Sequence, residues 1–197
     1  MNSERLSYDQ IVELVDSGAS VLDLGCGDGS LLERLVRERG VRGRGVEIEE
    51  AMIRECIAKG ISVFQGNLDE GLQDYDSQTY DFVILNQTIQ VVHEPVLLLK
   101  EMIRVGRQVI IGFPNFGFIV NRIQLGVFGH MPKHRSLPYE WFNTPNIHLC
   151  TRRDFRNLCR DFNISVHREI CFSGRRRIPP AFSNLFARSV YFVLSAT

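Results

Sequence analysis

From residue 19 onward, short apolar runs alternate with stretches in which apolar residues recur every three or four positions. The short runs predict buried strands, and the longer stretches predict amphipathic helices with one face on a core. The predicted strands are SVLDLG (20–25), GRGVEI (43–48), ISVFQGN (61–67), YDFVILNQ (80–87) and RQVIIGFP (107–114). The predicted helices are SLLERLVRERG (30–40), EEAMIRECIAKG (49–60) and EPVLLLKEMIRVG (94–106). This alternation indicates right-handed βαβ units and a mostly parallel sheet.

The pattern changes after Pro114. Residues 115–150 are rich in aromatic residues, glycine and proline and show little periodicity. TRRDFRNLCRDF (151–162) is again helical, with Thr151 and Asp154 placed as a capping box. ISVHREICF (164–172) and ARSVYFVLSA (187–196) predict two final strands. We expect an α/β, Rossmann-like fold with a seven-stranded, mostly parallel sheet, an antiparallel edge and helices on both faces. Residues 1–197 should form one domain, with 114–150 as a lid or interface insertion.

Charge and cysteine content exclude several classes of function. The 23 basic and 23 acidic residues balance, so no overall charge favours nucleic acid or a membrane. GRRRIPP (174–180) has no interleaved aromatic residues for base stacking, and we interpret it as a solvated turn. MNSERLSYDQ (1–10) lacks the apolar core of a secretion signal. The five cysteines form no CxxC pair, which predicts free thiols, a cytoplasmic location and no metal site.

A glycine-rich turn, GCGDG (25–29), joins the first predicted strand to the first predicted helix. Glycines at such a turn let a ligand approach the backbone at the helix N-terminus. In an open α/β sheet, ligands bind at the carboxyl ends of the strands. Glu47 ends the second strand about twenty residues further on, where a carboxylate can accept both hydroxyl groups of a ribose. The sequence therefore predicts a nucleoside ligand.

The charges around this turn separate two kinds of nucleoside. The pyrophosphate of a dinucleotide would be repelled by Asp23 and Asp28, and Ser30 stands where GxGxxG has its third glycine. S-adenosylmethionine has no phosphate and carries a sulfonium and an ammonium group. Because a hydrogen bond to a charged group contributes about 1.5–3 kcal/mol, the aspartates favour the cationic ligand.

DLGCGDG (23–29) resembles the first motif of the S-adenosylmethionine-dependent class I methyltransferases. The resemblance implies that Asn67 and Leu68, after the third strand, hold the adenine, with the Asn67 side-chain oxygen accepting from its amino group. It also implies that Asn86 and Gln87, after the fourth strand, face the methionine moiety. The residues expected to bind S-adenosylmethionine or S-adenosylhomocysteine are Asp23, Gly25, Cys26, Gly27, Asp28, Glu47, Ile48, Asn67, Leu68, Asn86 and Gln87.

Two longer segments narrow the resemblance. QTIQVVHEPVLLLKEMIRVGRQVIIGFPNFG (87–117) and MPKHRSLPYEWFNTPNIHLCTRRDFRNLC (131–159) resemble the methionine biosynthesis protein MetW family, as does nearly all of the chain. The resemblance implies a methyltransferase-like fold in a protein required alongside the homoserine O-acyltransferase MetX. It does not imply that the protein methylates a substrate.

No catalytic residue can be assigned from the sequence. No Asn-Pro-Pro-Tyr motif follows the fourth strand, and a base for methyl transfer could come only from His93, His148 or Tyr139. Three readings stay open: a partner that binds S-adenosylmethionine and regulates MetX, an active methyltransferase on a small molecule, and a ligand-free interaction module. The first is favoured because residues 113–142 combine many aromatic residues, Trp141 among them, with Arg122 and Arg135, as interfaces do.

Overall fold

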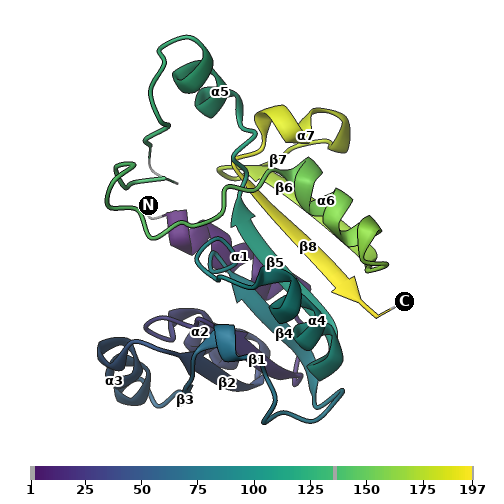
Figure 1. Ribbon diagram of the computed structural model, residues 1–197. Coiled ribbons are helices and arrows are strands. Elements are labelled where there is room, and N and C mark those ends of the chain that lie inside the picture. Colours follow the sequence, from purple (N-terminus) through teal and green to yellow (C-terminus); the bar gives the residue numbers. More distant parts are fainter. Residues whose placement is uncertain (1–2, 135–136, 197) are drawn as a thin grey trace.

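The computed structural model describes residues 3–134 and 137–196, and their strands form one eight-stranded sheet in the order β3-β2-β1-β4-β5-β8-β6-β7 (Figure 1). The parallel part contains β3 (Ser62–Gln65), β2 (Arg42–Glu47), β1 (Ser20–Leu24), β4 (Tyr80–Asn86) and β5 (Gly106–Pro114). The antiparallel part contains β8 (Ser189–Ser195), β6 (Ser165–Ser173) and β7 (Arg176–Arg177). The predicted mostly parallel sheet with an antiparallel edge is confirmed.

The predicted number of seven strands is wrong by one. The additional strand, β7, has two residues, Arg176 and Arg177, which pair with Ser173 and Phe172 of β6. Gly174 makes the tight turn between them with a φ of 62°, a value that glycine adopts without strain. The arginine-rich turn is therefore the tip of a hairpin.

Helices cover both faces of the sheet, as predicted. The helices are α1 (Ser3–Leu14), α2 (Ser30–Arg39), α3 (Glu50–Ala58), α4 (Pro95–Val105), α5 (Ile119–Gly126), α6 (Arg152–Asp161) and α7 (Pro180–Phe186), with a short 3-10 helix η1 (Leu68–Glu70). Side chains of α1, α2 and α3 share one buried cluster, and those of α4 and α6 share the other. The prediction missed α1, α5 and α7. None of the described helices is both long enough and apolar enough to cross a membrane.

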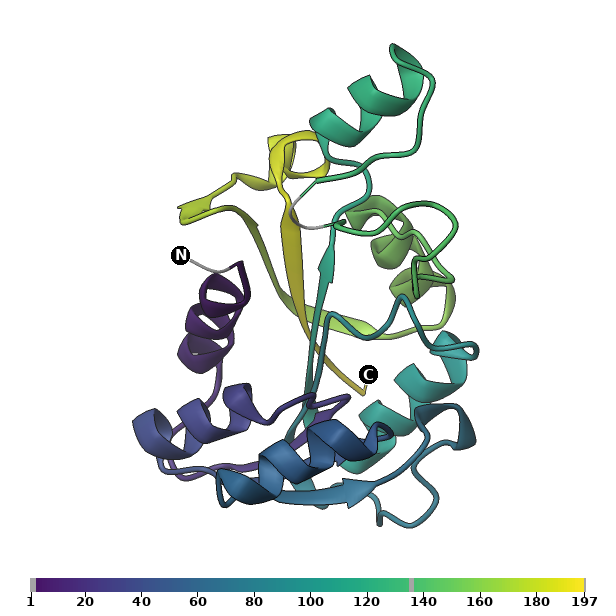
Figure 2. The ribbon, with the colours of Figure 1, turned by 90° about the vertical axis from the view of Figure 1, so that its left-hand side faces the viewer.

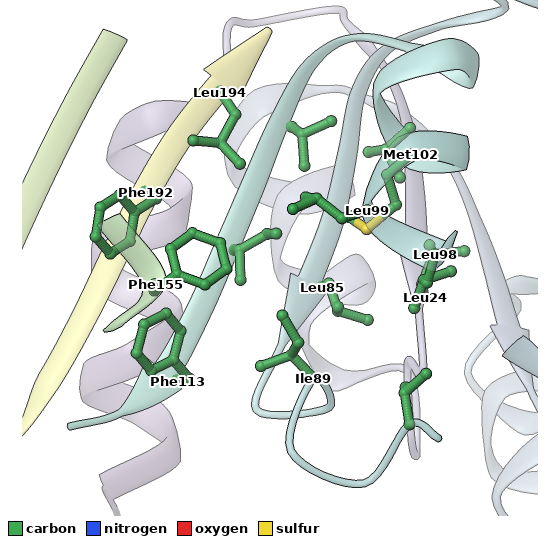
Figure 3. Close-up of a cluster of buried hydrophobic side chains, with 14 of the residues drawn as sticks. Leu24, Leu85, Ile89, Leu98, Leu99, Met102, Phe113, Phe155, Phe192 and Leu194 are labelled. Atoms are coloured by element: carbon green, nitrogen blue, oxygen red, sulfur yellow. The ribbon is translucent and has the colours of Figure 1, made fainter. Parts of the chain in front are cut away.

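The strands supply both clusters because successive side chains of a strand point to opposite faces. Leu22 and Leu85 pack with α4 on one face, whereas Val21 and Ile84 pack with α1 and α2 on the other. Figure 3 shows the α4 side of this core and, beside it, the aromatic rings that attach α6 to β5 and β8. The Phe155 ring centroid lies 5.1 Å from that of Phe113 and 4.7 Å from that of Phe192.

The insertion, residues 114–150, leaves the sheet after β5 and returns at α6. It contains α5, which projects with its following loop beyond the end of the sheet (Figures 1 and 2). The root of the insertion is fixed, because Phe116 N donates to Cys150 O at 3.0 Å and Asn115 N donates to Arg188 O at 2.8 Å. Arg135, which the sequence placed among the interface residues, lies outside the described residues.

Candidate functional site

The glycine turn lies between β1 and α2, at the carboxyl end of the parallel strands. Gly25 and Gly27 have φ values of 66° and 56°, and the N–H groups of Gly25 and Cys26 donate to Val46 O on β2. A Cβ on Gly25 would lie 2.7 Å from Cγ2 of Thr88, whereas a Cβ on Gly27 would meet no atom within 4 Å. Gly25 is thus needed for packing, and Gly27 leaves the backbone accessible.

Two thiols lie beneath the turn. Cys26 and Cys56 are buried with their sulfur atoms 3.9 Å apart, and the Cys56 thiol donates to Gly27 O at 3.1 Å. Burial raises the pKa of both thiols above the usual value, so they stay protonated. Their role in the described structure is to pack and hold the turn against α3.

Asp23, on β1 just before the turn, is only 2% exposed. Its Oδ2 atom has no hydrogen-bond partner in the described part of the chain. Burial, and secondarily the nearby Glu47 carboxylate, raises the pKa of Asp23 from 3.8 to about 8. A buried carboxyl group without a partner is costly to ionise, and a ligand cation placed beside it would remove that cost.

The negative charge of Asp28 is balanced by a neighbouring lysine, which weakens the repulsion of phosphate expected from the sequence. Lys59 Nζ lies 2.5 Å from Asp28 Oδ2, and the Ser30 hydroxyl donates to the same carboxylate at 2.6 Å. Although partial burial opposes ionisation, the hydrogen bonds from Lys59 and Ser30 hold the pKa of Asp28 below its usual value. Asp28 is therefore ionised and paired, and it repels a phosphate less than an unpaired aspartate would.

Glu47 lies at the end of β2 and is buried against the turn. Its Oε2 accepts from Gly27 N at 2.9 Å, and its Oε1 accepts from the N–H groups of Ile48 and Glu49 at 2.8 and 3.0 Å. The carboxylate therefore joins the glycine turn of β1 to the loop after β2. The Ile48 side chain is exposed beside it, as a surface against which a flat ring can pack.

Asn67 and Leu68 are used differently from the expectation. The Asn67 side-chain oxygen, assigned to the adenine, accepts from Asp69 N at 3.1 Å and caps η1. Leu68 packs against the α4 side of the core. An adenine contact by the Asn67 oxygen would have to replace this cap.

A cavity of about 1020 Å³ opens beside the turn. Of the expected site residues, its wall includes Asp23, Gly25, Cys26, Gly27, Asp28, Asn86 and Gln87. Glu47, Ile48, Asn67 and Leu68 are not part of this wall, although Glu47 touches Gly27 directly. Sequence reasoning missed the remaining wall, which includes Tyr8 and Asp9 of α1, Arg34 of α2 and Arg175 of the β6–β7 hairpin.

The wall at the end of β4 connects to the insertion. Gln87 has a φ of 58°, uncommon for a residue with a side chain, and donates its N–H to Gly112 O at 2.7 Å. Gln90 Nε2 donates to Gln87 O at 2.8 Å. Gln90 O in turn accepts from the N–H groups of Ile147 and His148, at 2.8 and 3.0 Å. Two hydrogen-bonded steps through Gln90 thus join the cavity to the insertion.

None of the three candidate bases lies in the cavity wall. His93 is exposed and pairs through Nδ1 with Asp69 at 2.8 Å. His148 lines a small apolar pocket between β5 and the insertion, with Phe113 and Leu149. Tyr139 is half-exposed on the insertion. Within the described chain, no three His, Cys, Asp or Glu residues are grouped so that they could hold a metal ion.

Two comparisons of sequence agree with each other. The family model for the methionine biosynthesis protein MetW matches residues 5–194. A bifunctional methionine biosynthesis protein MetXA/MetW from Rhodopirellula baltica is 36% identical in an alignment of 191 residues that covers 91% of this chain and 31% of that protein. The chain therefore spans about a third of the length of this relative.

Solved structures show the fold. A methyltransferase dependent on S-adenosylmethionine from Mesorhizobium loti has a TM-score of 0.71 at 14% identity, covering 96% of this chain and 97% of its own. The magnesium protoporphyrin IX methyltransferase from Synechocystis, solved with bound S-adenosylhomocysteine, has a TM-score of 0.69 at 20% identity, covering 98% of this chain and 84% of its own. The fold is therefore that of the S-adenosylmethionine-dependent methyltransferases, and the chain belongs to the MetW family of methionine biosynthesis proteins.

Proposed function

We propose that this methyltransferase-like protein binds S-adenosylmethionine or S-adenosylhomocysteine in the cavity beside the glycine turn. The observation that carries the proposal is Asp23, a buried carboxyl group with an unpartnered oxygen in the described chain, in the cavity wall. A ligand ammonium or sulfonium group suits this carboxylate, and a pyrophosphate does not. Gly27 supports the same ligand, because the space beyond its Cα is free for close approach.

The role of the bound ligand is proposed to be regulatory. The protein would act with the homoserine O-acyltransferase MetX and report the supply of S-adenosylmethionine to it. Two observations support this: the R. baltica relative carries both MetXA and MetW in its name as one bifunctional protein, and His93, His148 and Tyr139 lie away from the cavity wall. A cytoplasmic location is part of the proposal and is supported by the five free thiols.

An active methyltransferase on a small molecule is the second candidate. S-adenosylmethionine supplies an activated methyl group when bound. The cavity, at about 1020 Å³, is at the upper end of ligand pockets, which are ~300–1,000 Å³, and so has room for an acceptor as well. Tyr8 and Asp9, both in the wall, are the groups placed to orient such an acceptor.

Calorimetry tests the ligand. Purified protein is titrated with S-adenosylmethionine, S-adenosylhomocysteine and NAD in two buffers of different ionisation enthalpy. We expect both adenosyl ligands to bind and NAD not to bind. Because a cation favours ionised Asp23, whose pKa is about 8 without ligand, binding at pH 7 should release close to one proton. Binding of NAD without any response to the adenosyl ligands would refute the assignment.

A second measurement separates the two roles. The acylation rate of purified MetX is followed with this protein present, with and without S-adenosylmethionine, while methyl transfer from labelled ligand is assayed in parallel. A ligand-dependent change in acylation supports the regulatory role. Methyl transfer to a small molecule, with acylation unchanged, makes the methyltransferase the better description.

A further inference from the structure

The insertion exposes an unusual amount of apolar surface. Trp141, Phe142 and Phe128 are 73%, 69% and 67% exposed. The other large apolar residues of the insertion that are exposed are Ile123, Leu125, Val127, Met131, Tyr139, Ile147 and Leu149. The exposed residues of α5 and of the chain just after it project beyond the sheet, whereas those of residues 139–149 lie on the loop that returns to α6 (Figure 2). We call these exposed apolar side chains, which belong to the described residues 123–134 and 137–149, the apolar face.

The apolar face is large enough to be a protein interface. An aromatic side chain has about 150–250 Å² of surface, so its four aromatic residues alone expose on the order of 500 Å². With the aliphatic residues the sum is on the order of 1,000 Å². The largest apolar patch on a typical monomer is about 300–600 Å², and a standard interface buries about 800 Å² on each partner. An apolar surface of this size is larger than a protein that contacts only water normally exposes.

The apolar face is not the wall of the ligand cavity. The described residues that line the cavity come from α1, β1, the glycine turn, α2, α3, the end of β4 and the β6–β7 hairpin, and none comes from the insertion. Trp141 and Phe142 contact each other edge to face, with ring centroids 5.7 Å apart, and both point to solvent. Both side chains are therefore accessible to another protein while the cavity holds a ligand.

Contacts inside the insertion hold its base rigid. Asn121 is only 3% exposed; its Nδ2 donates to Phe116 O at 3.0 Å, and its Oδ1 accepts from His134 Nε2 at 2.6 Å. Arg122 Nε donates to Gly117 O at 2.7 Å, and the Arg188 guanidinium lies 5.2 Å from the Phe118 ring centroid.

We propose that the apolar face is the surface on which the homoserine O-acyltransferase docks, with Trp141 and Phe142 as its central anchors. The inference rests on the proposed function for the identity of the partner. The summed exposed apolar area of these residues is comparable with one side of a standard interface. The R. baltica relative identifies the partner, because its name joins MetXA and MetW in one protein. This chain matches 31% of the length of that protein.

The test measures the dissociation constant of the purified acyltransferase for four forms of this protein: the parent, Trp141→Ala, Phe142→Ala and Phe64→Ala. Phe64 is the matched control, because it is an aromatic residue 56% exposed on β3, an edge strand four positions from β5 in the sheet. Truncation of an interface anchor to alanine typically weakens binding about 30-fold or more. We expect such a loss for Trp141→Ala and Phe142→Ala, and less than about a twofold change for Phe64→Ala.

Two results would overturn the proposal while leaving the partnership intact. The first is a parent that binds the acyltransferase and a Trp141→Ala variant that binds equally well. The second is a dimeric parent that becomes monomeric in Trp141→Ala, by light scattering, without any change in acyltransferase affinity; the face would then join two copies of this chain. A parent that does not bind the acyltransferase, with or without S-adenosylmethionine, would overturn both the docking surface and the partnership. Thermal unfolding of each variant confirms that the exposed substitutions leave the fold intact.

Discussion

At the scale of single residues, two carboxyl groups near the ends of neighbouring strands do different work. Glu47 accepts three backbone N–H groups and holds the glycine turn. Asp23 keeps one oxygen without a partner among the described residues and has a pKa of about 8. The Glu47 carboxylate uses three of its roughly four acceptor sites for the fold and keeps one for a ligand hydroxyl, whereas the free oxygen of Asp23 is available to a ligand cation.

The raised pKa of Asp23 predicts how stability depends on pH. The folded protein holds the Asp23 proton up to about pH 8, whereas the unfolded chain releases it near its ordinary pKa of 3.8. The contribution to stability is therefore complete below pH 4 and is lost as pH rises toward 8. The ligand-free parent should lose on the order of 3 kcal/mol of unfolding free energy relative to Asp23→Asn between pH 5 and pH 8. Urea unfolding at several pH values checks this; parallel curves for the two proteins would contradict it.

Replacing Glu47 should affect ligand binding and stability together. Glu47→Ala is expected to weaken adenosyl-ligand binding by about 1.5–3 kcal/mol, because a hydrogen bond to a charged group is lost. It should also lower the unfolding free energy by about 1–3 kcal/mol, because Gly27 N and Ile48 N lose their acceptor. Glu49→Ala, an exposed neighbour, is the control for both measurements. Unchanged calorimetry and unfolding curves for Glu47→Ala would mean that the nucleoside lies elsewhere.

The sequence predicted which residues surround the glycine turn better than it predicted how they are bonded. Motif spacing places Asp23, Gly27 and Asn86 in one cavity wall, because parallel strands end at a common edge. It could not show that Lys59 pairs with Asp28, since that lysine is 31 residues away and its orientation depends on the path of α3. The helix that carries Tyr8 could have been predicted, because Ile11, Val12 and Val15 have the spacing of one helix face. These three residues are buried in the structure.

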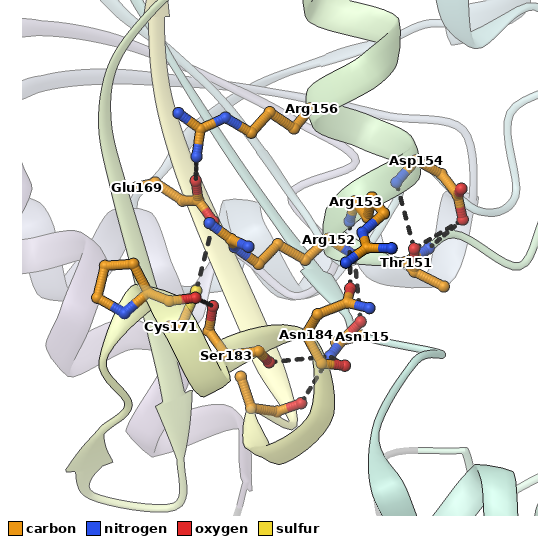
Figure 4. A network of polar contacts seen from close by, with 12 residues as sticks. Asn115, Thr151, Arg152, Arg153, Asp154, Arg156, Glu169, Cys171, Ser183 and Asn184 are labelled. Carbon is orange, nitrogen blue, oxygen red and sulfur yellow. Dashed lines mark hydrogen bonds and ion pairs between the residues drawn. The ribbon is translucent and has the colours of Figure 1, made fainter.

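At the scale of elements, one asparagine joins the end of β5 to two helices (Figure 4). Asn115 is 1% exposed, and its Nδ2 donates to the carbonyl groups of Ser183, Asn184 and Ala187 at the end of α7. Its Oδ1 accepts from Gly117 N and from Arg152 N at the start of α6. The point where the insertion leaves the sheet is thus bonded to both α6 and α7.

Asn115→Ala should destabilise the protein strongly. The change leaves buried carbonyl and N–H groups without partners, each at about 1–3 kcal/mol, so we expect a loss of about 2–4 kcal/mol in unfolding free energy. Asn143→Ala is the matched control, because Asn143 is exposed and accepts a single backbone hydrogen bond from Glu140 N. Its effect should stay within about 0.5 kcal/mol. Equal urea midpoints for the two variants would contradict the bridging role.

Elements with a strong period were predicted and elements held by tertiary contacts were not. The capping box at Thr151 and the strand and helix order through β5 are confirmed. Helix α5 contains Val120, Ile123 and a terminal Gly126, which disfavour a helix, and it is held by the Asn121 and Arg122 side chains. Strand β7 has no apolar residue and forms because the Gly174 turn brings its two arginines beside β6.

At the scale of the whole molecule, the cavity and the insertion are joined through Gln90. Its side chain donates to Gln87 O at the cavity, and its carbonyl oxygen accepts from the root of the apolar face at Ile147 and His148. A ligand that favours one arrangement of Gln87 would therefore also favour one arrangement of the insertion. Only a difference in affinity between two arrangements can transmit an effect.

Coupling between the two sites should depend on this link. Coupling free energies are typically about 1–3 kcal/mol, so S-adenosylmethionine should change the affinity for the acyltransferase by about 5- to 150-fold, and the acyltransferase should change the ligand affinity by the same factor. Gln90→Ala removes the hydrogen bond to Gln87 O and should bring both factors toward one. Gln108→Ala, exposed on β5, should leave them as in the parent. A coupling factor that survives in Gln90→Ala would contradict the route.

The exposed apolar face has a consequence for how much of this protein a cell can hold. Trp141 and Phe128 stay exposed to solvent in every copy that has no partner bound. Large exposed apolar surfaces promote aggregation. Unmatched copies would then be removed or would precipitate, so that the abundance of one protein limits the useful abundance of the other. In the R. baltica relative, whose name joins MetXA and MetW in one protein, the ratio of the two parts is fixed at synthesis. In this view, the insertion ties the amount of this protein that stays in solution to the amount of its partner.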